Sequence, residues 1–169
     1  SGWTNPDFFP ISVFFGRPSP DHVASLKDAG INLYMGVEHN PTVDPLSNVT
    51  SQGIFAMPGG EWTPAEVGND TGAVAWFISD ECEMGSDGCS DEDINGDGRI
   101  DEYDGLLKQQ QYVTARRNLN DGRFLHANFG NGILRTYWSP NTMDDHVALM
   151  DSASADKYTY TSPAVADII

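Results

Sequence analysis

The chain has 169 residues, enough for one hydrophobic core, whereas a complete eight-stranded α/β barrel usually needs about 250 residues. Its 25 acidic and 9 basic side chains give a formal net charge of −16, which makes nucleic-acid backbones and anionic membrane surfaces poor partners because both would be repelled. No apolar run approaches the roughly 18 residues that cross a bilayer, so membrane insertion is not expected.

The first third of the chain predicts a β-α-β unit. The apolar run 8–15, FFPISVFF, predicts an inner strand, and a helix follows over 20–29 with Pro at its first position. The run 31–37, INLYMGV, predicts the second strand. This strand delivers Glu38 and His39 to the carboxyl end of the sheet.

A third strand is predicted over 53–57, after a loop or short helix in 41–51. Trp62 follows this strand in a Gly- and Pro-rich loop, and two roles for it are open. An exposed indole would offer a flat apolar face to a sugar ring, whereas a buried one would pack in the core or at its rim.

Two adjacent carboxylates follow the fourth apolar run. Residues 73–79 are almost continuously apolar, which is typical of a strand covered on both faces in a parallel sheet. Asp80 and Glu81 therefore lie at its carboxyl end, where parallel barrels carry their chemistry. An ion pair or a role as further calcium ligands is the alternative for these two side chains.

Cys82 and Cys89 are the two cysteines of the chain and lie in a Gly-, Ser- and Asp-rich segment. We predict a disulfide between them that pins the loop beside the carboxylates, with two free thiols as the alternative. Asn48-Val-Thr50 and Asn69-Asp-Thr71 match the N-glycosylation pattern, which also occurs often by chance.

The segment 93–104 matches a calcium loop of the EF-hand type, and its ending in Asp104 instead of Glu is similar to loops of extracellular calcium proteins and dockerins. Gly98 makes the sharp turn, Arg99 offers its carbonyl oxygen and Ile100 is the expected apolar anchor. An acidic turn that binds nothing is the alternative. Side-chain oxygens for Ca²⁺ come from Asp93, Asn95, Asp97, Asp101 and Asp104. Together with the cysteine pair and the acidity, this loop favours an exported, secreted protein.

The rest of the chain predicts a helix over 101–118, a strand over 123–129 with Asn128 near its exit, a helix over 143–150 and a strand over 155–160. The four histidines show no paired spacing for a zinc site.

Taken together, FPISVFFG, DAGINLYMG, the early EW and AWFISDE resemble the first six units of a (β/α)₈-barrel glycoside hydrolase of the clan A type. The resemblance covers nearly the whole chain. It implies an α/β fold, a parallel TIM-type barrel that is incomplete in this chain. Residues 1–169 would form a single partial barrel domain with a calcium-loop insertion at about 80–104.

In that family the acid/base is a Glu at the end of strand four, commonly preceded by Asn. Glu81 matches it, but Asp80 stands in place of the Asn, which leaves the role of Asp80 open and makes Glu83 a rival acid. The implied reaction is retaining hydrolysis of a polysaccharide, with a second carboxylate about 5–5.5 Å away as nucleophile. The family's nucleophile lies on strand seven, so we expect a second fragment or chain to complete the barrel.

The residues assigned to glycan binding are Glu38, His39, Trp62, Asn128, Tyr158 and Tyr160. The alternative function is a noncatalytic extracellular calcium-binding module that binds glycans or assembles into a surface structure. It needs no catalytic carboxylate.

Overall fold

The computed structural model describes residues 2–130 and 139–156, and the chain falls into two compact units. The first unit comprises Ser1–Ile78 and Ala115–His126, and the second comprises Ser79–Thr114 and Ala127–Ile169. Within the described residues, no helix combines the length and the apolar character that crossing a membrane requires.

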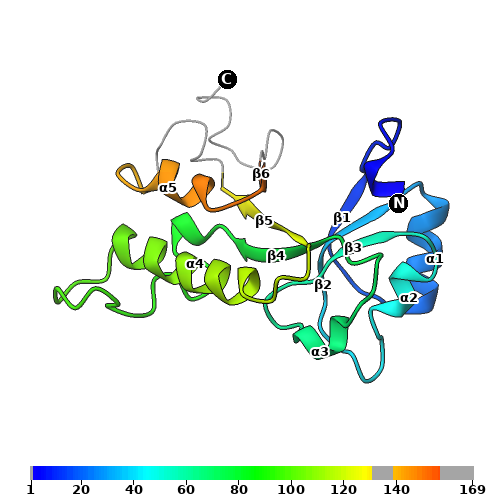
Figure 1. Cartoon of the computed structure of the whole chain (residues 1–169), viewed down its shortest axis with the longest axis horizontal. Helices are drawn as coiled ribbons and strands as arrows, with labels where there is room; N and C mark the ends of the chain where they lie inside the picture. Colours follow the sequence, from blue (N-terminus) through cyan, green and yellow to red (C-terminus); the bar gives the residue numbers. More distant parts are fainter. Residues whose placement is uncertain (1, 131–138, 157–169) are drawn as a thin grey trace, which may run out of the picture. The chain divides into compact units, whose positions relative to one another are not determined.

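Three parallel strands form the sheet of the first unit in the order β1-β2-β3 (Figure 1). Their bounds are Ser12–Gly16 for β1, Leu33–Val37 for β2 and Phe55–Met57 for β3. The central strand β2 has a paired neighbour on each side, and all of its residues except Met35 are buried.

Short helices accompany this sheet: η1 Gly2–Thr4, α1 Pro20–Asp28, α2 Ser47–Thr50 and α3 Pro64–Val67. Helix α1 begins with Pro at its first position, as predicted, and the chain leaves it through Gly30 at φ +89°. Helix α3 has a capping box, in which the Thr63 side chain accepts the Glu66 N–H and the Glu66 carboxylate accepts the Thr63 N–H.

The core of the first unit is built from the apolar faces of the strands. A buried cluster joins Leu33, Met57, Ala75 and Phe77, with partly buried aromatic and Met side chains around it. Trp76 is fully buried, and the Arg116 guanidinium lies 4.0 Å from its ring centroid. The attraction between this cation and the indole face adds to the stabilisation that comes from burying the large side chain.

A second three-stranded sheet has the order β4-β5-β6 (Figure 1). Its strands are β4 Ala75–Asp80, β5 Phe124–Phe129 and β6 Ser152–Ala155, and the helices that follow β4 and β5 are η2 Cys82–Met84, α4 Glu102–Arg117 and α5 Met143–Ala148. In the second unit Ala127 and Phe129 of β5 pack with Met143 of α5 in a small buried cluster.

The predicted TIM-type barrel is wrong. The strands form two separate three-stranded parallel sheets, and these do not close into a barrel. A barrel requires an uninterrupted ladder in which every strand is paired on both sides. Here β3 has only three residues, and an isolated parallel bridge joins its residue Ala56 to Ala73, which precedes β4.

The first strand also differs from its prediction as a buried inner strand. Phe14 and Phe15 are 39% and 41% exposed, and Phe15 has φ +49°, outside the extended region. Phe14 and Gly16 pair with β2 but Phe15 does not. An apolar run predicts a strand but not which neighbours will cover it.

The last predicted strand, 155–160, falls mostly outside the described residues, and β6, which spans Ser152–Ala155, shares only Ala155 with it. Residues 157–160, with Tyr158 and Tyr160, lie outside the described residues, so their predicted glycan contacts stay predictions. The other predicted strands and the helices α1, α4 and α5 are present, with ends that shift by a few residues.

Candidate functional site

The candidate site begins at the carboxyl end of β4. Asp80 is the last residue of this strand and Glu81 follows it directly. The preceding residues 75–79 are buried, as the apolar run predicted. Glu81 adopts the left-handed conformation, with φ 51° and ψ 40°. This conformation is uncommon for a residue other than Gly, and it turns the chain sharply out of the strand at the two carboxylates.

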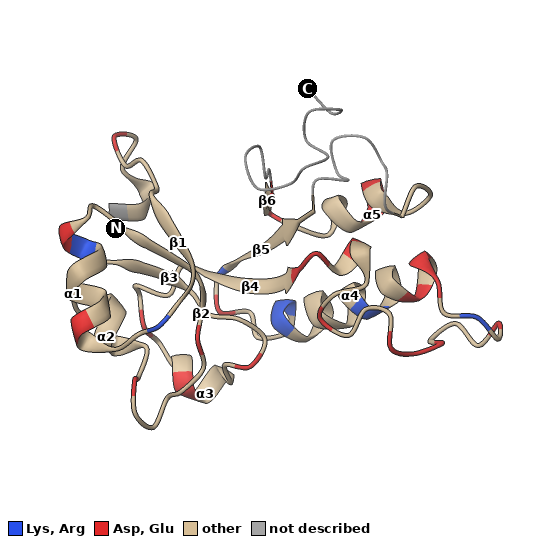
Figure 2. Cartoon of the chain, turned by 180° about the vertical axis from the view of Figure 1, so that it is seen from behind, with Lys and Arg blue, Asp and Glu red and all other residues tan. Residues whose placement is uncertain are grey.

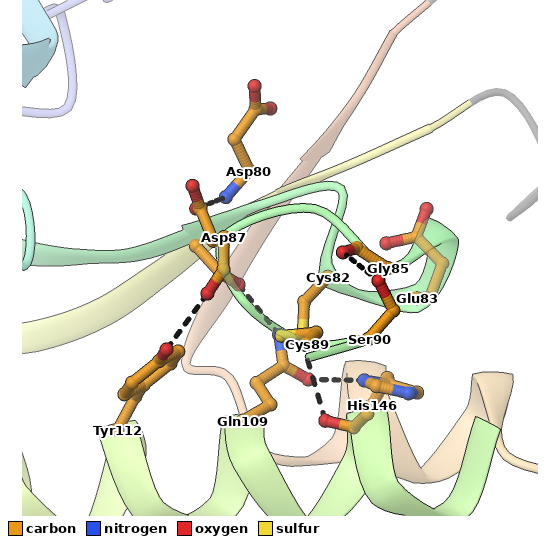
Figure 3. Close-up of a disulfide and its surroundings, with 12 residues drawn as sticks. Asp80, Cys82, Glu83, Gly85, Asp87, Cys89, Ser90, Gln109, Tyr112 and His146 are labelled. Carbon is orange, nitrogen blue, oxygen red and sulfur yellow. Dashed lines mark hydrogen bonds between the residues drawn. A yellow bond between two sulfur atoms is a disulfide. The ribbon is translucent and has the colours of Figure 1, made fainter. Parts of the chain in front are cut away.

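A disulfide closes the next loop and confirms the predicted pairing of Cys82 with Cys89, whose Cα atoms are 5.4 Å apart (Figure 3). Both cysteines are buried. Inside the loop the Asp87 carboxylate accepts the Asp80 N–H at 2.6 Å, and the Asp87 carbonyl accepts the Tyr112 hydroxyl at 2.8 Å (Figure 3). The disulfide loop is therefore tied to the end of β4 and to α4.

Glu83 lies inside this loop and is only 5% exposed. Its Oε1 accepts the Gly130 N–H at 2.6 Å, and its main-chain carbonyl accepts the Ser139 hydroxyl at 2.6 Å. The other carboxyl oxygen, Oε2, is buried and has no hydrogen-bond partner in the described part of the chain. Burying such an oxygen costs free energy, which makes the group a candidate for a functional role.

The carboxyl groups of Glu81 and Glu83 both lie close to Gly130. A Cβ atom at this position would lie 3.1 Å from Glu81 Oε1 and 3.2 Å from Glu83 Oε1, and it would overlap Met84 Sδ. Both carboxyl groups therefore flank the same point. Only Gly leaves room for both without a shift of these side chains.

Asn128 of β5 supports the two residues at the end of β4. Its Nδ2 donates to Asp80 Oδ1 at 2.9 Å, and its carbonyl accepts the Glu81 N–H at 2.8 Å. The Ser154 hydroxyl donates to Asn128 Oδ1 at 2.6 Å. The side chain is 2% exposed and has protein partners at both amide atoms, so the structure gives it a supporting position. Direct substrate contact by Asn128 stays a prediction.

The pKa values of Asp80, Glu81 and Glu83 are all raised, and burial is the largest cause for each. The neighbouring negative charges of Asp80 and Asp156 raise the pKa of Glu81 further. The Gly130 N–H opposes the shift of the Glu83 pKa but does not cancel it. Carboxyl groups of this kind can retain a proton at a pH where ordinary ones have lost it, as a general acid must.

The second unit also contains a row of buried, hydrogen-bonded polar side chains that the sequence analysis did not predict. Gln109 Nε2 donates to Ser79 Oγ at 2.9 Å, and Gln109 Oε1 lies 2.6 Å from His146 Nδ1, which places the ring proton on Nδ1 (Figure 3). His146 Nε2 is buried without a partner among the described residues, and burial lowers the pKa of His146 to about 4. These residues are far apart in sequence, so no spacing pattern predicts the hydrogen bonds between them.

Three residues predicted to bind glycan belong to the first unit. Glu38 and His39 are exposed after β2, and His39 Nε2 lies 3.2 Å from Glu66 Oε2. Trp62 is 1% exposed, and its Nε1 donates to the Val37 carbonyl at 2.9 Å. An indole buried in this way cannot stack on a sugar, so the prediction of an exposed platform is wrong and the packing alternative holds.

The predicted calcium loop is closed by its own backbone amides. Asp93 Oδ1 accepts the N–H groups of Gly96 and Asp97 at 2.7 and 3.2 Å, and Asp93 Oδ2 accepts that of Gly98 at 2.8 Å. Gly96 and Gly98 have φ values of +77° and +88°, which suit Gly in a tight turn.

Asp104 closes the loop from its other end. Its carboxylate is fully buried, and Oδ1 accepts the N–H groups of Ile94 and Asn95 while Oδ2 accepts that of Asp101. These backbone hydrogen bonds lower the pKa of Asp104. The shorter Asp side chain at the last position thus reaches the start of the loop.

Three further loop side chains each accept the backbone N–H of the residue two positions later. Asn95 accepts that of Asp97, Asp97 that of Arg99, and Asp101 that of Tyr103. No group of three or more His, Cys, Asp or Glu side chains is arranged for a metal ion within the described ranges. The candidate metal-ligand atoms of the loop are nevertheless all oxygens, which fits Ca²⁺. Ile100 is 52% exposed, so its predicted role as an apolar anchor is wrong.

Comparison of the chain with models of known families, with curated proteins and with solved structures finds no match.

Proposed function

We propose that this chain belongs to a secreted, glycoside hydrolase-like protein that acts on a polysaccharide, with Glu81 as the general acid. The observation that carries the proposal is the gathering of Asp80, Glu81 and Glu83 at the end of β4, all with raised pKa. Glu81 is a more suitable donor than Glu83 because it is half-buried, whereas Glu83 is almost fully enclosed.

In the proposed reaction the protonated Glu81 carboxyl donates to the glycosidic oxygen, which then leaves with its sugar. Burial raises the pKa of Glu81, the negative charges of Asp80 and Asp156 raise it further, and both effects favour the protonated carboxyl that the reaction needs. Asn128 orients Asp80, and Gly130 keeps the space beside Glu81 open. We place the attacking carboxylate of a retaining mechanism outside these residues, on a further polypeptide segment.

The test is hydrolysis of a panel of polysaccharides by the full-length native protein, with any co-purifying polypeptide retained. Glu81→Gln keeps the shape of the side chain but cannot donate the proton, so it should lower the rate by about 10²–10⁴-fold. Glu61→Gln, at an exposed position of the first unit, is the matched control and should keep the wild-type rate.

Glu83→Gln separates the two candidate acids. Full loss with Glu83→Gln and normal activity with Glu81→Gln would assign the acid to Glu83 and reject Glu81. If the folded native protein hydrolyses none of the polysaccharides in the panel, the hydrolase proposal itself is rejected.

The hydrogen-bonded loop 93–104 favours the second candidate, a noncatalytic extracellular calcium-binding module. We propose that it holds Ca²⁺ through side-chain oxygens and the Arg99 carbonyl. Bound calcium would neutralise local acidic charge and order the segment between β4 and α4. The side-chain ligands would be Asp93, Asn95, Asp97, Asp101 and Asp104.

Calorimetry with CaCl₂ tests the loop, with MgCl₂ as the competing cation. Asp97→Ala should abolish the binding heat and the rise in melting temperature on adding calcium, because it removes one ligand. Asp28→Ala, at an exposed position of α1, should retain both. If wild type shows no binding heat and the same melting temperature in CaCl₂ and EDTA, the loop does not bind calcium.

A further inference from the structure

The two N-glycosylation patterns of the chain both lie in the first unit, but the structure places them in opposite settings. Transfer of a glycan needs the amide nitrogen of the Asn and the hydroxyl of the Ser or Thr two residues later.

In the Asn48 pattern both groups already have protein partners. Asn48 is half-buried in α2, and its Nδ2 donates to the Pro18 carbonyl at 3.0 Å. The Thr50 hydroxyl donates to Asp70 Oδ2 at 2.6 Å. A glycan on Asn48 would displace α2 from the segment before α1.

In the Asn69 pattern both groups face solvent. Asn69 and Thr71 are exposed on the turn that follows α3. Neither the Asn69 amide nor the Thr71 hydroxyl forms a hydrogen bond with another described residue, although Asp70 between them is anchored. A glycan on Asn69 would extend away from the protein without breaking a contact.

The backbone of this turn is held firmly although its side chains are exposed. Arg123 Nη2 donates to the carbonyls of Gly68 and Asp70 at 2.8 and 3.1 Å. Asp70 Oδ1 accepts the Gly72 N–H at 2.8 Å. The turn therefore presents Asn69 and Thr71 in the folded state, with no local unfolding required.

From this contrast we propose that Asn69 is an N-glycan acceptor of this protein and that Asn48 is not. The inference rests on the proposal that the protein is secreted. The donor is a glycan on a polyprenyl diphosphate. Asn69 Nδ2 forms a bond to C1 of the first sugar, the bond from C1 to the diphosphate oxygen breaks, the lipid diphosphate leaves, and Nδ2 releases one proton.

The experiment is secretion of the full chain from a eukaryotic host, followed by intact mass measurement before and after treatment with peptide N-glycosidase. Wild type should carry one glycan, and peptide mapping should place it at Asn69. Asn69→Gln and Thr71→Ala should each remove the whole mass increment, whereas Asn48→Gln should leave it unchanged.

A folded, secreted wild type without a glycan, or with its glycan at Asn48, overturns the proposal. If secretion fails, the folded protein is incubated with a single-subunit oligosaccharyltransferase and its lipid-linked glycan, and absence of transfer to Asn69 has the same meaning. The readout does not depend on hydrolysis. A glycosylated but inactive protein would therefore refute the proposed hydrolase and leave the acceptor site standing.

Discussion

The environment of Glu83 differs from that of an ordinary, solvent-exposed carboxylate. One of its oxygens bonds the Gly130 N–H, and the other is buried without a partner among the described residues. Burial and the charges of Glu81 and Asp80 raise its pKa. A protein tolerates a group of this kind when the site gains something that a neutral side chain would not provide.

This environment predicts a pH-dependent effect of Glu83→Gln on stability. Because the folded-state pKa is raised above the ordinary value of 4.5, the contribution of Glu83 is most favourable below that pH and is lost as pH rises through the folded-state pKa. Gln cannot ionise, so the variant should melt at a higher temperature than wild type at neutral pH.

The difference should shrink as the pH falls below 4.5. Thermal melts of wild type, Glu83→Gln and the control Glu61→Gln across this range would measure it. If the melting temperatures of Glu83→Gln and wild type differ by the same amount at every pH, ionisation of Glu83 does not destabilise the folded protein.

Among the elements, the disulfide loop after β4 does most to define the site. It holds Glu83 between its two cysteines and contacts α4 closely, where a Cβ on Gly105 would lie 3.3 Å from the Cys89 carbonyl oxygen. A helix can approach a loop this closely only at a small residue. The loop, the helix and the strand end thus form one local structure around the carboxylates.

Removing the disulfide should therefore affect both stability and the site. With a separation of seven residues between the cysteines, the chain-entropy estimate is about 2.5 kcal/mol. The double variant Cys82→Ser/Cys89→Ser should lose about this much free energy of unfolding in urea titrations. Wild type treated with a reductant should behave like the variant, and a midpoint unchanged in both would show that the loop is held by its other contacts.

At the scale of the whole molecule, the acidic charge is the dominant property. The net charge is −16, and Figure 2 shows acidic residues along the segment between β4 and α4. Like charges at this density repel one another and oppose the compact state, and dissolved salt screens them.

Raising NaCl from about 10 mM to about 150 mM shortens the screening length from about 30 Å to about 8 Å and should raise the melting temperature by a few °C. Differential scanning fluorimetry at neutral pH measures the effect. Repeating the titration near pH 4, where many carboxylates are neutral, is the control and should give a smaller rise. A melting temperature independent of NaCl at neutral pH would contradict this account.

The sequence by itself determined the features that depend on neighbouring residues. The runs 31–37 and 73–79 predicted β2 and β4, and the cysteine pair predicted the disulfide. Periodicity, helix starts and short loops are local properties, so they can be recognised before any tertiary contact is known. The position of Asp80 and Glu81 at a strand end follows from the same local pattern.

Only the tertiary structure decided which strands pair and which side chains are buried. It replaced the barrel with two sheets, buried Trp62 and Glu83, and distinguished Asn69 from Asn48 through hydrogen bonds to distant residues. The reason is physical: pairing and burial depend on contacts between segments far apart in sequence, and the same apolar run or the same Asn-X-Thr triplet is compatible with either outcome.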